Sequence, residues 1–74
     1  MKRVLHLLHP GDVTLASLVI RQAVEAGGEV TVALLQGAVP GPLPDGTRTR
    51  RVPDDLSWEA LLEEVFAADH VITW

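Results

Sequence analysis

Histidines are the side chains of this sequence best suited to proton transfer or to metal binding. His9 precedes a Pro10–Asp12 turn that leads into a predicted helix, where free backbone N–H groups and the helix dipole can hold an anion. An imidazole can also serve as a general base near neutral pH, but no nucleophile or carboxylate lies beside His9 in the sequence. Two interpretations therefore stand for Gly11 and Asp12: an anion-binding or substrate-binding turn, and a turn whose aspartate caps the helix.

Thiol chemistry is excluded because the sequence has no cysteine. Disulfides, thiolate zinc sites and cysteine nucleophiles are therefore ruled out, which leaves His6 and His70, besides His9, as soft metal ligands. These two residues lie in predicted strands and could meet across a sheet, but zinc sites usually have three or four ligands. We expect no metal and no cofactor, with both histidines satisfied within the sheet.

Arginines cluster in the segment 47–52, where Arg48, Arg50 and Arg51 alternate with threonines. On a strand, Arg48 and Arg50 share a face, and paired guanidinium groups suit a phosphate or a carboxylate of a partner. Charged side chains on an edge strand also block aggregation without any partner. Because the net charge of the chain is −4, we expect no direct binding to nucleic acid and assign Arg50 and Arg51 as candidates for the charged rim of a protein interface.

Apolar patterning predicts strands and helices in the order β-α-β-β-α-β. The strands are expected over residues 4–8, 30–35, 47–52 and 70–74. The nearly continuous apolarity of the first two is typical of strands in a parallel sheet that is buried on both faces. Glycines and prolines between 36 and 45 preclude a regular element there.

The two predicted helices each have an apolar stripe that should pack on this sheet. The first helix is ended by Gly27-Gly28. Its stripe is formed by Leu15, Leu18, Val19, Gln22, Ala23 and Ala26. The second helix begins after Ser57, its expected N-cap. Its apolar face is formed by Trp58, Leu61, Leu62, Val65 and Phe66.

These elements predict a single α/β domain over residues 1–74, a small parallel sheet of about four strands with helices packed on it. Ligands and reactive groups in such sheets gather beyond the carboxyl ends of the strands, here residues 9–12, 36–39 and Trp74. No apolar run approaches the roughly 20 residues that span a bilayer, and the N-terminus lacks a cleavage site for a signal peptide. We therefore expect a soluble, cytoplasmic protein.

Small size makes association with another chain plausible on energetic grounds. A chain of 74 residues buries only about 60 to 65% of its unfolded surface. Trp74 stands at the end of the last predicted strand, and an aromatic side chain of this kind can bury roughly 150 to 250 Å². Trp58 and Trp74 thus belong either to the core or to an interface.

Three segments in this order resemble the DsrH/TusB family of sulfur-relay proteins within the DsrE-like superfamily. They are Val4–His9 with its Leu-His opening, Val32–Val39 with Leu-Leu-Gln-Gly-Ala-Val, and Ala68–Trp74 ending in tryptophan. The family typically has a similar opening strand, an LLQDGV-like segment and a final strand that ends in tryptophan. This sequence lacks the aspartate of the second segment and is shorter than usual between Gln36 and Ser57.

The resemblance implies a parallel-sheet α/β fold and assembly with sister subunits of the TusC and TusD type. Such complexes pass persulfide sulfur toward thiolation of the tRNA wobble uridine, or serve sulfur oxidation. A chain without cysteine cannot carry a persulfide. The expected role is thus that of a non-catalytic subunit, with Trp74, His9 and Gln36 as contact residues at strand ends.

Two other functions stay open on the sequence. A small homo-oligomeric module could bind an anion or a nucleotide at the strand carboxyl ends, and ligand-dependent stabilisation without a partner would reveal it. A hydrolase or transferase that uses His9 lacks a convincing nucleophile.

Overall fold

The computed structural model describes residues 2–39 and 43–74. The elements in chain order are β1 (Arg3–Leu8), α1 (Thr14–Glu25), β2 (Glu29–Leu35), β3 (Thr47–Val52), α2 (Trp58–Ala67) and β4 (His70–Thr73). This order confirms the β-α-β-β-α-β prediction. Pro40, Gly41 and Pro42, which the sequence places in an irregular segment, lie outside the described residues.

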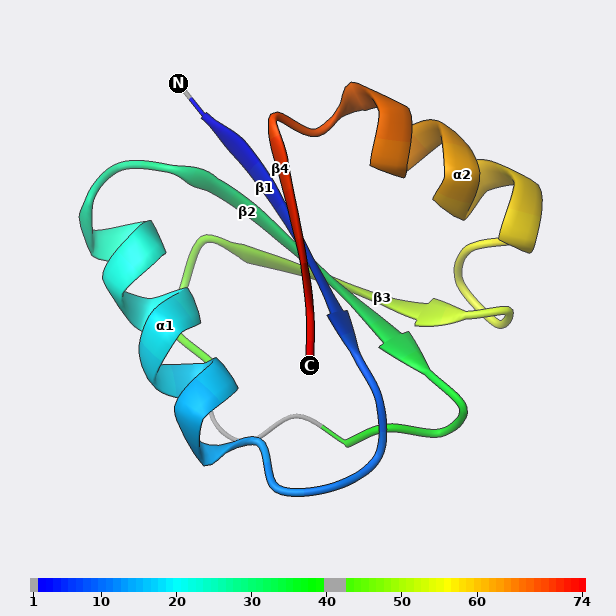
Figure 1. The fold of residues 1–74 in the computed structure, drawn as a ribbon, viewed down its shortest axis with the longest axis horizontal. Coiled ribbons are helices and arrows are strands. Elements are labelled where there is room, and N and C mark those ends of the chain that lie inside the picture. The colour runs from blue at the N-terminus through cyan, green and yellow to red at the C-terminus, as the bar shows by residue number, and fades with distance from the viewer. Residues whose placement is uncertain (1, 40–42) are drawn as a thin grey trace.

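The strands form one parallel sheet with the order β3-β2-β1-β4. The predicted small α/β fold is therefore confirmed, with β1 and β2 in the centre and β3 and β4 at the edges. Figure 1 shows α1 on one face of this sheet and α2 on the other, with β4 nearest the viewer. None of the described helices is both long enough and apolar enough to cross a membrane.

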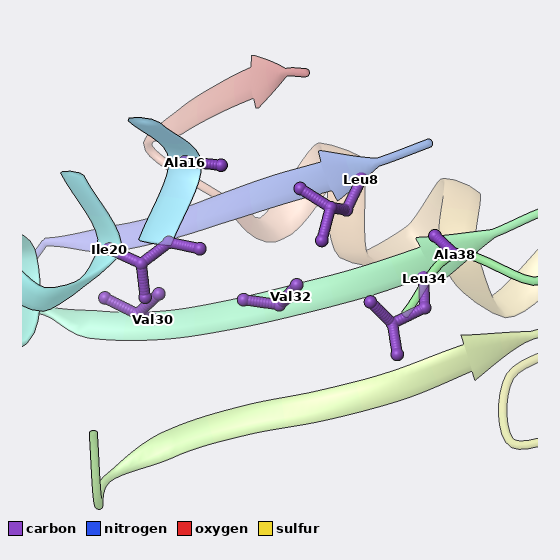
Figure 2. Packing of buried hydrophobic residues seen from close by; sticks show 7 residues of the cluster. All are labelled: Leu8, Ala16, Ile20, Val30, Val32, Leu34 and Ala38. Atoms are coloured by element: carbon purple, nitrogen blue, oxygen red, sulfur yellow. The ribbon is translucent and has the colours of Figure 1, made fainter. Parts of the chain in front are cut away.

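One core lies between the sheet and α1. Val30, Val32 and Leu34 alternate along β2 and belong to one buried cluster with Ile20 of α1, which lies beside Val30 in Figure 2. Leu8 of β1 completes the apolar surface beneath the helix. Successive side chains of a strand point to opposite faces, so one set of β2 residues serves this core while its neighbours serve the other.

The second core lies between the sheet and α2. Leu5, Ala33, Leu35, Val52 and Leu61 form its buried cluster. These residues come from β1, β2, β3 and α2, so the helix joins the three strands on this face. Since a buried aliphatic side chain contributes roughly 1.5 to 3 kcal/mol, the two cores are the main source of stability for the chain.

The predicted stripe of α1 is correct at Ala23, which packs against the core, but is wrong at its two leucines. Ala16 and Ile20 are buried, whereas Leu15 and Leu18 are 61% and 51% exposed. The sequence of α1 is apolar around more than half of its circumference, so two overlapping stripes satisfy the helical period. The angle at which the helix crosses the strands decides which of the two stripes packs on the sheet.

The predicted stripe of α2 is only partly buried. Leu61 is buried and Val65 packs beside it, but Leu62 is 55% exposed. Trp58 and Phe66 are likewise exposed. The predicted start is confirmed, because the Ala60 backbone N–H donates to Ser57 Oγ at 3.1 Å.

We expect the two sides of α1 to respond differently to truncation. Ile20→Val removes one methylene from a fully buried site and should lower the free energy of unfolding by about 0.5 to 1.5 kcal/mol. Leu18→Ala removes more atoms from an exposed site and should cost less than about 0.5 kcal/mol. Urea unfolding followed by circular dichroism measures both; a larger cost for Leu18→Ala would restore the predicted stripe.

Candidate functional site

The carboxyl ends of the strands meet at one edge of the sheet because all four strands are parallel. The residues that follow β2, β1 and β4 are Gln36, His9 and Trp74, in the order in which these strands lie side by side. We call these three residues the carboxyl-end rim. The structure thus brings the three predicted contact residues to the same edge, and it links two of them directly.

His9 and Trp74 are joined through the backbone of Trp74. The Trp74 carbonyl oxygen lies 3.1 Å from His9 Nδ1 and 3.4 Å from the His9 backbone nitrogen. Because a carbonyl only accepts hydrogen bonds, His9 Nδ1 carries the proton in this contact. The Trp74 backbone N–H donates to the Leu7 carbonyl at 2.9 Å, which continues the β1–β4 ladder to the last residue.

The indole of Trp74 packs inside the molecule. Its Nε1–H donates to His6 Nδ1 at 2.9 Å, and the two rings lie nearly parallel, with an interplanar angle of 12° and centroids 6.2 Å apart. The indole is only partly buried and packs against the core beneath α1. Trp74 therefore has a role in the protomer itself, and any contact with a partner would use the exposed remainder of its side chain.

The hydrogen bond from Trp74 determines the tautomer of His6, and burial lowers its pKa. The side chain is completely buried, and because Nδ1 accepts from the indole, the neutral ring must carry its proton on Nε2. Within the described ranges, Nε2 has no hydrogen-bond partner. Removal from water disfavours the imidazolium, so the pKa of His6 lies below its ordinary value.

Gln36 has a backbone conformation that few residues other than glycine adopt. Its φ is 53°, and Gly37 follows with a φ of 75°. The turn is closed by the Ala38 N–H, which donates to the Leu35 carbonyl at 3.0 Å. A left-handed residue with a Cβ costs roughly 1 to 2 kcal/mol, and such residues cluster at functional sites. The exposed Gln36 side chain is therefore presented to solvent from a strained turn.

Asp12 occupies the start of α1 with its own carboxylate. Its Oδ1 accepts from the Thr14 hydroxyl at 2.7 Å and from the Thr14 backbone N–H at 2.9 Å. These two bonds, the side-chain bond first, hold the pKa of Asp12 below its ordinary value. The N-cap position of α1 is Val13, so Asp12 is not the N-cap itself but lies one residue before it. Its carboxylate still uses a backbone donor that an anion at Gly11 and Asp12 would need.

The arginines of β3 point in different directions. Arg50 is paired in register with Ala33 and Arg51 with Leu34, so their side chains leave opposite faces of the sheet. Arg50 is partly buried, and its guanidinium donates to the Thr49 carbonyl at 3.2 Å. These two residues therefore cannot form one charged rim on a single face. Arg48 and Arg50 do share a face, as the sequence predicts.

Two clefts border the sheet at its opposite ends. A cleft of about 230 Å³ lies at the carboxyl ends of β2 and β3 and is lined by Gly37, Val39, Arg51 and Asp54 among others. A larger one of about 330 Å³ lies between the amino ends of the strands and α2, where Arg48 faces an acidic helix that includes Glu63 and Glu64. The larger cleft is thus at the end of the sheet where open parallel sheets do not usually bind ligands.

The histidines show no arrangement for metal binding. His70 is exposed and lies opposite Val4, whereas the buried His6 lies opposite Ile72. In the described part of the chain, no three His, Asp or Glu side chains are grouped closely enough to hold a metal ion.

The partnership of His6 with Trp74 is a contact that sequence reasoning missed. The two residues are 68 positions apart, so no local pattern joins them. The available signal was chemical: a histidine within an apolar strand needs a polar partner, and a tryptophan N–H needs an acceptor.

Comparison with protein-family models, with curated proteins and with solved structures finds no match to this chain. The resemblance to the DsrH/TusB family therefore depends on the three sequence segments alone.

Acidification should destabilise the chain through His6. Its folded pKa is lowered, so its contribution to stability is complete above the unfolded value of 6.5 and decreases as the pH falls through it. We expect the free energy of unfolding to fall between about pH 7.5 and about pH 5. His6→Gln should lose this fall and the exposed His70→Gln should keep it, both measured by urea unfolding. The same fall in His6→Gln would contradict the assignment.

Removing the steric strain of the left-handed backbone at Gln36 should raise the free energy of unfolding. Glycine adopts a φ of 53° without a steric penalty, whereas alanine retains the Cβ. We expect Gln36→Gly to unfold with a free energy about 0.5 to 1 kcal/mol higher than that of Gln36→Ala. Thermal and urea unfolding of the pair measures the difference, and equal stabilities would show that the turn is not left-handed in solution.

Proposed function

We propose that this chain is a non-catalytic subunit of a cytoplasmic sulfur-relay complex of the kind that the DsrH/TusB family forms. The complex would support persulfide transfer for thiolation of the tRNA wobble uridine or for related sulfur metabolism. The observation that carries the assembly role is the open edge of β4, which pairs with β1 on one side and with no other described strand on the other.

The outer edge of β4 offers hydrogen-bonding groups to a partner. The inward bonds of the ladder are made by alternate residues, as the Trp74 N–H bond to the Leu7 carbonyl shows. Val71 and Thr73 therefore direct their backbone N–H and C=O groups away from the sheet. Apart from His70, the strand consists of uncharged residues, so no fixed charge protects it from a strand of another chain.

The carboxyl-end rim continues this edge. His9 holds the carbonyl of Trp74 at the end of β4, and Gln36 projects from its turn two strands away. A partner strand along β4 would end beside His9 and Trp74, which supports their role as contact residues. Arg51 lies near the carboxyl end of β3, which is the opposite edge strand of the sheet.

Because this chain has no cysteine, the proposal assigns the sulfur chemistry to another subunit. Persulfide transfer needs a thiolate, so the sulfur would be carried by a sister subunit of the TusC or TusD type. The present chain would contribute an interface and shape the surroundings of that thiol. The sulfur chemistry is supported by the three sequence segments, and the assembly by the open edge.

A second candidate function is supported by the 230 Å³ cleft at the carboxyl ends of β2 and β3. Arg51 and the backbone of Gly37 line it, which suits a small anion, although Asp54 lies there as well. As an independent homo-oligomeric module, the chain would be stabilised by phosphate or a nucleotide alone.

The test is native mass spectrometry of the tagged chain purified gently from its own host. We expect small cysteine-bearing proteins at a fixed stoichiometry. Thr73→Pro removes an outward N–H while leaving the inward ladder bonds in place, and prolines are tolerated on edge strands. It should weaken the complex at least about tenfold, because a backbone hydrogen bond and the adjoining partner strand are lost. A homo-oligomer without such companions would favour the second candidate.

A further inference from the structure

Helix α2 presents an apolar stripe that no described part of the chain covers. Trp58, Leu62 and Phe66 are spaced four residues apart and lie along one side of the helix, with exposed fractions of 57%, 55% and 79%. We call these three residues the α2 stripe. Single exposed apolar residues are ordinary, but a continuous row with two aromatic residues is typical of an interaction surface.

The size of the stripe is that of a functional contact. An aromatic side chain can bury roughly 150 to 250 Å², so the exposed fractions of Trp58 and Phe66 leave on the order of 300 Å² available. Residues at positions i, i+4 and i+8 form the ridge that fits the groove of a second helix at an axial separation of about 8 to 10 Å. The shape therefore suits an amphipathic helix.

The negative charges beside the α2 stripe favour a partner with basic residues. Glu59 and Glu63 follow the α2 stripe around the helix, with Glu63 also at the border of the cleft that Arg48 lines, and α2 contains no basic residue. Neither glutamate forms an ion pair within the described ranges, where the observed pair joins Arg3 to Glu29. A helix with lysine or arginine beside its own apolar residues would meet apolar surface with apolar surface and pair both carboxylates.

The same charges disfavour two other occupants. A second copy docked through α2 would place its glutamates against those of the first, and each copy has a net charge of −4. An anionic membrane surface would be repelled by the glutamates, whereas membrane-surface helices usually have basic residues in that position.

We infer that the α2 stripe is the docking site for a basic amphipathic helix of a different protein. This inference goes beyond the proposed function, since it requires neither sulfur chemistry nor the β4 edge. It adds a second contact surface, on the face of the sheet covered by α2.

The experiment uses a fluorescein-labelled helical peptide with leucines at i, i+4 and i+8 and lysines beside them, and a twin with glutamates in place of the lysines. Fluorescence anisotropy with the full chain should show the basic peptide binding at least about tenfold more tightly than its twin. Leu62→Glu should reduce that affinity at least about tenfold. Leu15→Glu, at a similarly exposed leucine of α1, is the matched control and should leave it unchanged.

Charge reversal tests the selectivity directly. The double variant Glu59→Lys/Glu63→Lys should prefer the acidic twin, whereas Glu25→Lys on α1 should not change the preference. The inference is overturned if the basic peptide does not bind up to about 100 µM. It is likewise overturned if Leu62→Glu and Leu15→Glu weaken binding equally.

Two further measurements detect the competing occupants. Sedimentation that shows a dimer dissolved by Leu62→Glu would assign the stripe to a second copy. Flotation with phosphatidylcholine–phosphatidylglycerol vesicles that Leu62→Glu abolishes would assign it to a lipid surface. Either result overturns the inference. Recovery of cysteine-free partners in the native complex would instead refute the sulfur-relay role and leave peptide binding at the stripe intact.

Discussion

The structure depends on one constraint: the described part of the chain supplies a single helix for each face of a four-stranded parallel sheet. Four strands about 4.8 Å apart make a surface roughly 19 Å wide, whereas a helix with its side chains is about 10 Å wide. Each helix can therefore cover the central strands but not the whole sheet. β1 and β2 are buried on both sides, and the edges and the flanks of the helices stay open. The two surfaces that we propose as partner sites, the β4 edge and the α2 stripe, are exposed because the helices do not cover the whole sheet.

Sequence patterns predicted the order and the approximate bounds of the elements because apolarity and turn residues act locally. The Ser57 cap and the strand at Thr47–Val52 depend on neighbours a few residues away, and both are present. The helix faces could not be predicted as well. The apolar surface of each helix is wider than the strip that the sheet covers, and the covered strip depends on the crossing angle, a property of the assembled domain. Leu18 and Leu62 were consequently assigned to the core and lie outside it.

The candidate site was predictable in position but not in connectivity. Parallel strands must bring His9, Gln36 and Trp74 to one edge, so their shared location followed from the strand pattern. The hydrogen bond from Trp74 to His6 spans almost the whole chain and has no local signature. It turns a residue expected to serve a partner into one that also closes the protomer, and it leaves a neutral imidazole in the interior. The backbone strain at Gln36 was equally hidden, because the pattern of residue types does not report φ.

The unlike edges of the sheet have a consequence for how assemblies can grow. β4 ends the sheet with uncharged residues, whereas β3 ends it with Arg48 and a partly buried Arg50. Head-to-tail stacking, in which the β4 edge of one molecule meets the β3 edge of the next, would generate an open filament. Guanidinium groups on β3 oppose that contact, since an inward-facing charge on an edge strand prevents a foreign strand from adding. In an assembly formed through the β4 edge, the sheet would therefore be extended in one direction only, which would favour closed complexes of fixed size over fibres.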